Sequence, residues 1–310
     1  MAIKNVIKKL GSVLGLIVIV VTLAILSPTF LTLDNIFNVL RQVSINALIA
    51  FGMTFVILTG GIDLSVGSIL ALASALTAGF MVGGMDPILA MFIGVILGAI
   101  MGALNGFVIS KGKVAPFIAT LATMTIFRGL TLVYTNGKPI TGLSDAVTFQ
   151  MMGRGYFFGI PFPVIIMIIS FFILYIILRK TTFGRGVYAI GGNEEASRLS
   201  GLKVDGIKIG VYTISGAMAA LAGMILTSRL NSAQPTAGTA YEMDAIAAVV
   251  LGGTSLSGGR GRIIGTLIGA LIIGVLNNGL NLLGVSSFYQ QVVKGGVILL
   301  AVLLDRKKSA

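Results

Sequence analysis

The sequence contains no cysteine and no histidine. Without thiols the chain has no disulfide bond and no thiolate nucleophile, and without imidazoles it has no histidine-based acid or base. Zinc and haem sites lose their usual ligands for the same reason. We therefore expect no metal site and no catalytic residue in this chain.

Charged residues are also scarce. They make up 10% of the 310 residues, against 56% that are hydrophobic, and the mean hydropathy is +1.02. A soluble domain carries about 25% charged residues, so this composition excludes one. The net charge is +12, but the cations are scattered between apolar runs rather than gathered in a basic arm. That pattern argues against nucleic acid as a partner and indicates membrane lipid.

Long apolar runs predict the fold class. The hydrocarbon core of a bilayer is about 30 Å thick and needs about 20 apolar residues per helix. Ten segments approach this requirement: Leu10–Ser27, Ser44–Ile62, Leu64–Met85, Pro87–Ser110, Val114–Tyr134, Pro161–Leu178, Ile209–Ser228, Met243–Leu251, Ile263–Leu283 and Phe288–Leu304. The eighth is short and is expected to be a broken or re-entrant helix. We predict an all-α polytopic membrane protein with about ten transmembrane helices, in which residues 1–310 form one transmembrane domain and the 42 glycines allow close helix packing.

The distribution of Lys and Arg predicts the orientation. With ten spans both termini share one side of the membrane. If that side is the cytoplasm, only Arg41, Lys138, Arg154 and Arg229 fall on the outside, and nearly all other cations fall on the inside. Cytoplasmic loops carry the excess of Lys and Arg, so we place the N- and C-termini in the cytoplasm.

The segment 179–208 is the longest of the predicted cytoplasmic connections, and it contains a short helix signal. Asn193 can cap a helix, Glu194 and Glu195 place negative charge on its first turn, Arg198 follows late, and Gly201 can end it in the left-handed conformation. Such a helix is suited to docking into a groove of a partner. The alternative is a surface helix that only joins two spans.

Ionisable residues within or beside the spans are candidates for function. Arg128 lies past the middle of its span, where it either serves function or extends to the outer face. Lys294 lies close to the outer end of its span and is expected to extend to that face. Asp63 is predicted at the inner boundary, where it caps the next helix or, as an alternative, takes part in coupling.

Uncharged amides are candidates for contact with a polyhydroxylated substrate, because each offers donors and acceptors. Asn277, Asn278 and Asn281 share one predicted helix, and Gln42 and Asn46 lie four residues apart near the outer start of another. We predict these five residues and Arg128 as a translocation path. The alternative is hydrogen bonding between packed helices.

Two glycine-rich segments, Gly60–Gly67 and Gly252–Gly259, are weakly similar. Both follow spans that run in the same direction, so they do not indicate an inverted repeat of the transporter kind. Chance similarity explains them adequately. The chain also lacks a Gly-x-x-x-x-Gly-Lys-Ser/Thr phosphate loop, so any ATP hydrolysis must belong to another chain.

Four motifs carry a resemblance to a known family: Leu58–Ser68 (LTGGIDLSVGS), Gly184–Arg185 with Ala189–Glu194 (AIGGNE), Arg198–Gly201 (RLSG) and Ser232–Gly238 (SAQPTAG). On these motifs the chain resembles the sugar permeases of binding-protein-dependent ABC importers. The stretch from Asp244 to Asp305 resembles the ribose members of that family. The resemblance covers nearly the whole chain after about Ser27.

The resemblance implies a homodimeric permease in the cytoplasmic membrane of a bacterium, with ABC ATPase subunits inside and a sugar-binding protein outside. ATP and magnesium would be bound by the ATPase, and this chain would bind no cofactor. The residues that would meet the ATPase are Arg185, Gly191, Gly192, Asn193, Glu194, Glu195 and Arg198.

The sequence fits two other functions less well. An ion-coupled secondary sugar carrier usually needs carboxylates or histidine within the membrane, and here the carboxylates are predicted at span ends. A membrane-embedded enzyme would need a nucleophile and a base at one depth, and the sequence indicates none.

Overall fold

The computed structural model describes residues 2–143 and 147–309, and about three quarters of the chain, 76%, is helical. The helices are α1 (Ala2–Leu26), α2 (Leu33–Leu58), α3 (Val66–Val82), α4 (Pro87–Ser110), α5 (Pro116–Thr135), α6 (Val147–Arg154), α7 (Phe162–Lys180), α8 (Thr182–Gly192), α9 (Glu194–Leu199), α10 (Val204–Leu230), α11 (Tyr241–Leu251), α12 (Ile263–Leu282) and α13 (Ser287–Ser309). Two short antiparallel strands, β1 (Tyr156–Phe157) and β2 (Ile160–Pro161), form a hairpin before α7.

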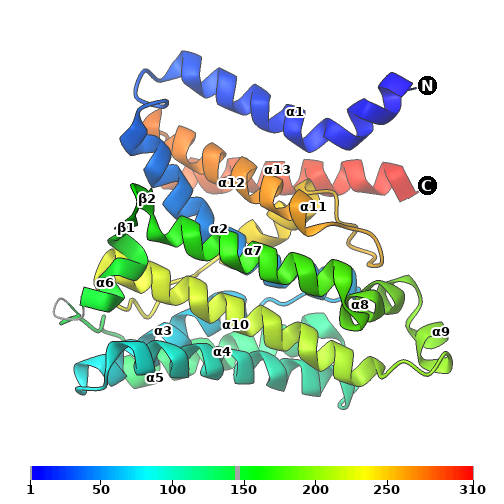
Figure 1. The fold of residues 1–310 in the computed structure, drawn as a ribbon, viewed down its shortest axis with the longest axis horizontal. Coiled ribbons are helices and arrows are strands. Elements are labelled where there is room, and N and C mark those ends of the chain that lie inside the picture. The colour runs from blue at the N-terminus through cyan, green and yellow to red at the C-terminus, as the bar shows by residue number, and fades with distance from the viewer. Residues whose placement is uncertain (1, 144–146, 310) are drawn as a thin grey trace.

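The long helices run side by side, with α1, α12 and α13 along one edge and α3, α4 and α5 along the opposite edge (Figure 1). The start of α1 and the end of α13 lie at the same end of the bundle as α8 and α9. We call this the arm end, and we call residues 182–199 the α8–α9 arm. Termini at one end are the arrangement expected when a chain crosses the membrane an even number of times.

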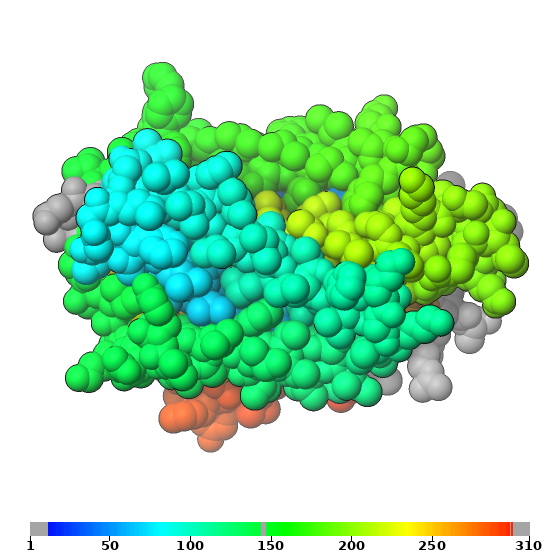
Figure 2. Space-filling view, turned by 90° about the horizontal axis from the view of Figure 1, so that it is seen from below, coloured from blue at the N-terminus to red at the C-terminus, as the bar shows by residue number. Residues whose placement is uncertain are grey.

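The centre of the bundle is built around α2 and α10. Large apolar side chains of α2, among them Phe51 and Phe55, are completely buried, and α10 packs on α2, α3 and α4. In contrast, α4, α5 and α7 expose many apolar side chains, including Phe92, Ile118 and Phe172. Exposed apolar surface of this extent fits contact with lipid. Figure 2 shows the face formed by α3, α4 and α5, with the α9–α10 region beside it at the arm end.

Small residues bring α4 and α10 into close contact. A Cβ added at Gly102 would overlap the carbonyl oxygen of Tyr212, and one added at Gly216 would overlap that of Gly98. The backbones approach closely only because both helices present glycine there, as is common for helix pairs in membranes.

A helix lies at each of the ten predicted spans, and the mostly helical fold is confirmed. Within the described part of the chain, six helices are both long and apolar enough to cross a membrane: α2, α4, α5, α7, α10 and α12. The predicted short span is α11, whose 11 residues reach only about 16 Å. Its core residues Ala247, Ala248 and Val249 are completely buried, so protein surrounds it as a broken helix requires.

Two features were not predicted. Helix α2 begins at Leu33 rather than Ser44, because its polar first turns are held by side chains of other helices, such as Arg229, which donates to Asn38 (2.8 Å). The segment before α7 contains α6 and the hairpin, where Arg41 lies over the ring of Tyr156.

Candidate functional site

The α8–α9 arm forms as its local sequence predicts. The Asn193 side chain accepts a hydrogen bond from the backbone N–H of Ala196 (2.9 Å) and so caps α9. Glu194 and Glu195 occupy the first turn of α9 and Arg198 the last, and Gly201 follows with a φ of +83°. These predictions of local structure are confirmed. Thr181 caps α8 in the same manner through the N–H of Gly184 (3.1 Å).

Gly191 fixes the arm to the rest of the protein. A Cβ at this position would overlap both the carbonyl oxygen of Leu58 and the backbone nitrogen of Gly259. These two atoms are themselves hydrogen-bonded to one another (3.0 Å). The arm therefore packs directly on the end of α2 and on the loop that follows α11. The two similar glycine-rich segments of the sequence thus lie next to each other, on either side of Gly191.

Tyr188 adds a second attachment of the arm. Its hydroxyl donates to the carbonyl oxygen of Gly261 (2.9 Å). Burial raises the pKa of Tyr188 above its ordinary value, while the nearby Arg179 and Arg262 oppose this shift. The phenol is therefore a protonated donor at neutral pH.

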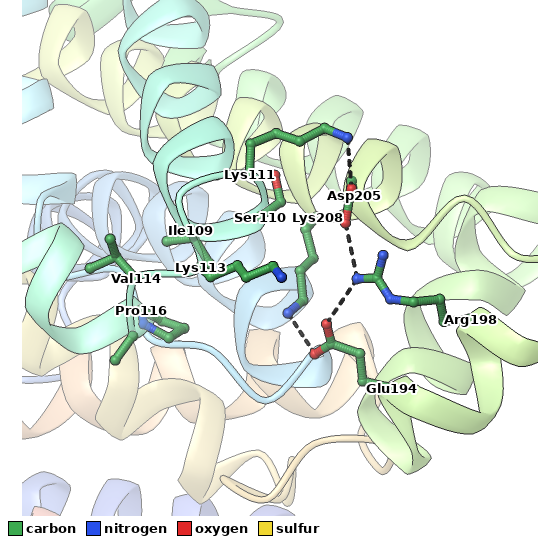
Figure 3. A pocket seen from close by; sticks show the side chains of 11 residues that line it. Ile109, Ser110, Lys111, Lys113, Val114, Pro116, Glu194, Arg198, Asp205 and Lys208 are labelled. Carbon is green, nitrogen blue, oxygen red and sulfur yellow. Dashed lines mark hydrogen bonds and ion pairs between the residues drawn. The ribbon is translucent and has the colours of Figure 1, made fainter.

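A network of ion pairs holds α9 against α4 and α10 (Figure 3). Glu194 binds Lys208 (2.6 Å), and Arg198 lies 3.6 Å from Glu194 and 3.0 Å from Asp205. Asp205 also binds Lys111 at the end of α4 (2.8 Å). Two residues predicted to meet the ATPase, Glu194 and Arg198, therefore also bind within the chain.

Other residues of the arm face outward. Arg185, Gly192 and Glu195 are exposed, and Leu199 is 83% exposed. Leu199 was not among the predicted contact residues, although an exposed apolar side chain on a short polar helix is typical of a contact surface. The exposed surface of the arm thus combines one apolar side chain, Leu199, with the charged side chains of Arg185 and Glu195.

Three of the predicted path residues meet in one cavity. Gln42, Asn46 and Asn277 line a space of about 120 Å³ together with Asp244 and Lys294. The rest of its wall consists of Ile45, Leu226, Arg229 and Tyr241. Asn277 is buried, and its Oδ1 has no hydrogen-bond partner among the described residues. We call this space the amide cavity.

The amide cavity contains an ion pair that the sequence did not indicate. The Nζ of Lys294 lies 2.9 Å from Oδ2 of Asp244, which is buried at the start of α11. A carboxylate at the start of another helix is therefore the partner of Lys294.

Asn278 and Asn281 lie outside this cavity. Asn278 exchanges two hydrogen bonds with Asn35 of α2 (2.8 and 3.1 Å), and Asn281 accepts one from Gln290 of α13 (2.8 Å). These are hydrogen bonds between packed helices, which was the alternative to a place on the translocation path. The structure therefore does not bring the three asparagines into one site.

Arg128 lies at another cavity. Its guanidinium donates to the carbonyl oxygens of Pro235 (2.7 Å) and Ala237 (2.8 Å), and a longer bond reaches Gly67 (3.4 Å). The side chain thus binds backbone within the bundle rather than extending to the outer face. The adjoining cavity of about 410 Å³ also contains Glu242 and Ser68, neither of which was predicted.

Asp63 is not at a boundary of the bundle, and this prediction is wrong. The chain unwinds after α2, where Gly60 has a φ of +77°, and returns into the bundle instead of continuing to the surface. Asp63 is completely buried there, opposite Ser215, which lies about 16 Å along α10.

The contacts of Asp63 are all with neutral donors. Its Oδ1 accepts from the backbone N–H (3.0 Å) and the hydroxyl (2.6 Å) of Ser65, and its Oδ2 accepts from Ser215 (2.8 Å). Ser65 in turn accepts from Asn105 of α4 (2.7 Å). The carboxylate closes the turn before α3 and connects that turn to α10 rather than capping α3 itself.

A family model described as "Branched-chain amino acid transport system / permease component" matches residues 35–302. The chain belongs to this family of transport permeases. The resemblance to permeases inferred from the motifs is thereby confirmed, and the protein is a multi-pass permease of the bacterial cytoplasmic membrane.

Curated relatives match the permease over nearly its full length. It is 70% identical over 306 residues to the Ribose import permease protein RbsC of Bacillus subtilis (strain 168), which covers 99% of this chain and 95% of that protein. The protein of the same name from Escherichia coli (strain K12) is 56% identical, over 96% of this chain and 93% of that protein. The one from Haemophilus influenzae (strain ATCC 51907 / DSM 11121 / KW20 / Rd) is 55% identical, over 95% of this chain and 92% of that protein. No solved structure matches the chain.

The described residues contain no group of three Asp or Glu side chains placed to hold a metal ion. The candidate functional site spans several parts of the bundle. It consists of an arm, two cavities that contain polar side chains within the bundle, and a buried carboxylate between them and the arm end.

Proposed function

We propose that the permease imports ribose as the transmembrane subunit of an ABC importer. The observation that carries this proposal is the 70% identity to a ribose import permease over 99% of the chain. Sugar is uncharged, and the amide cavity contains neutral donors and acceptors that can replace water around hydroxyl groups.

The arm end is the cytoplasmic side in this proposal, and about ten helices cross or enter the membrane. Arg179 and Lys180 in the last turn of α7 and Arg185 in the arm lie at this end, and cations favour the cytoplasmic side. The exposed residues Arg185, Gly192, Glu195 and Leu199 would then meet an ABC ATPase, which binds ATP and magnesium. Because Gly191 fixes the arm to α2, a movement of the ATPase would pass directly to the bundle.

The other parts of the assembly follow from the same proposal. A sugar-binding protein would deliver ribose at the end opposite the arm, and a second copy of the permease would complete the channel.

Reconstitution tests the division of labour. Vesicles that contain the permease, its ATPase and its binding protein are expected to accumulate ribose only when ATP is supplied to the ATPase. The permease alone is expected neither to hydrolyse ATP nor to accumulate ribose. Accumulation by the permease alone would contradict the proposal.

One observation favours a second candidate, an ion-coupled sugar carrier. Asp63, Asp244 and Lys294 lie inside the bundle, whereas the sequence placed the carboxylates at span ends. Each carboxylate is bound by hydrogen-bond donors or a cation, and a carboxylate with a purely structural role would be bound in the same way. An ionophore that abolishes ribose uptake at constant ATP would favour the carrier, and unchanged uptake would exclude it.

Asn277 and Asn278 provide a matched pair of variants for the path. Asn277→Ala is expected to lower ribose uptake several-fold with little change in stability, because its Oδ1 already lacks a partner among the described residues. Asn278→Ala is expected to lower the free energy of unfolding by about 1–2 kcal/mol, because it removes both hydrogen bonds between Asn278 and Asn35. Uptake kinetics and denaturant titration measure the two effects. Equal effects of both variants on uptake would remove the amide cavity from the path.

A further inference from the structure

A large cavity opens at the arm end between α9, the turn from α4 to α5, and the start of α10 (Figure 3). Its volume is about 730 Å³. The charged side chains that line it are Lys111, Lys113, Lys208, Arg198, Glu194 and Asp205. We call it the basic cavity.

The basic cavity has a surplus of positive charge. Four of its side chains are basic and two are acidic, and both acids already bind cations in the ion-pair network. Lys113 has no side-chain partner among the described residues, and it extends into the cavity from a backbone with a φ of +53°. A lysine in this left-handed conformation is uncommon.

The start of α5 adds to this field. Ala115 stands at the N-cap and provides no side-chain acceptor, so the first N–H groups of α5 lack a side-chain cap. Ala115 and Pro116 both line the cavity. The positive end of the helix dipole therefore faces the same space as Lys113, and both favour an anion.

An apolar surface adjoins the cavity. At the ends of α4 and α5 nearest to it, Phe107, Val108, Phe117 and Ile118 are between 37% and 61% exposed. A soluble anion has no use for this surface, but the acyl chains of a lipid do. Basic cavities between helices at the cytoplasmic face are typical sites for anionic lipid headgroups.

We propose that the basic cavity binds the phosphate headgroup of an anionic phospholipid of the cytoplasmic leaflet. The phosphate lies between Lys113 and the start of α5, and the acyl chains lie along Phe107 and Ile118. The headgroup connects the α4–α5 turn with α9 and so stabilises the position of the arm. The choice of leaflet rests on the proposed orientation, but binding does not depend on the identity of the sugar.

Lipid retention by the purified full-length permease tests this proposal. Native mass spectrometry of the chain titrated with phosphatidylglycerol is expected to show preferential binding over phosphatidylcholine. Lys113→Gln is expected to weaken phosphatidylglycerol binding about fivefold, the change expected for one lysine near an anionic lipid. Lys113→Arg is expected to retain it. The control is Lys138→Gln, which removes the same charge from an exposed position in the turn after α5, at the end of that helix opposite the cavity.

Three outcomes would overturn the proposal. Equal binding by Lys113→Gln and Lys138→Gln would remove Lys113 from the site. Displacement of the lipid by equal concentrations of inorganic phosphate would indicate a soluble anion. A Lys113→Gln variant that binds lipid normally but loses affinity for the ATPase would assign the cavity to that protein. None of these measurements involves transport, so failure of the proposed function would be seen separately.

Discussion

Gly191→Ala is expected to lower ATP-driven ribose uptake about tenfold in vesicles that contain the complete importer. The added methyl group would overlap two backbone atoms, the oxygen of Leu58 and the nitrogen of Gly259. Backbone cannot turn away as a flexible side chain can, so the arm must move off the end of α2. Overpacking of this kind costs about 1–3 kcal/mol, and a tenfold change corresponds to about 1.4 kcal/mol.

Gly206→Ala is the control for this prediction. Gly206 is an exposed helical residue in the first turns of α10, and a Cβ there meets nothing within 4 Å. Both variants gain the helix propensity of alanine, so a difference between them reports the packing of the arm. Wild-type uptake by Gly191→Ala, or an equal loss in both variants, would contradict the role assigned to Gly191.

The arm could be predicted because its structure is determined by neighbouring residues. Asn193, Glu194 and Gly201 carry the chemistry of a helix start and end within nine positions of the chain, and the structure has these features. The apolar runs predicted the positions of the helices for a similar reason. The hydropathy of a segment indicates whether lipid or water surrounds it. A span of about 20 residues is long enough to be recognised even when its exact ends are not.

Contacts between helices could not be predicted in this way. The periodicity of α12 places Asn277 and Asn281 on one face, but it does not say that Asn277 meets the amide cavity while Asn281 meets Gln290. Likewise nothing local indicates that Lys294 binds Asp244, since the two residues are 50 positions apart. Such partners depend on the packing of helices, which a single sequence does not specify.

The path of the backbone around Asp63 could not be predicted from the sequence either. The glycines at 60 and 61 indicated a turn, but the direction of the chain after the turn depends on what lies beside it. Ser215 and Asn105 provide the polar environment that lets residues 59–65 return into the bundle. Irregular backbone inside a membrane protein persists only where the protein itself supplies such hydrogen bonds.

Asp63→Ala is expected to lower the free energy of unfolding by about 3 kcal/mol. It leaves the backbone N–H and hydroxyl of Ser65 and the hydroxyl of Ser215 without their acceptor in a fully buried site. An unsatisfied buried donor costs about 1–3 kcal/mol, and the hydroxyls can recover part of this by turning to other acceptors. Denaturant titration of the purified permease measures the loss.

Asp63→Asn separates the hydrogen bonds of this residue from its charge. The amide oxygen can still accept from Ser65, and Ser215 can turn to accept from the amide nitrogen, so the loss should be about 1 kcal/mol. Ser215→Ala removes one donor and leaves the bonds from Ser65 in place, so it should cost a similar amount. If Asp63→Asn were as stable as expected but abolished ribose uptake, the charge itself would be required. Asp63 would then act in coupling, and its role as a structural link between the α2–α3 turn and α10 would not be sufficient.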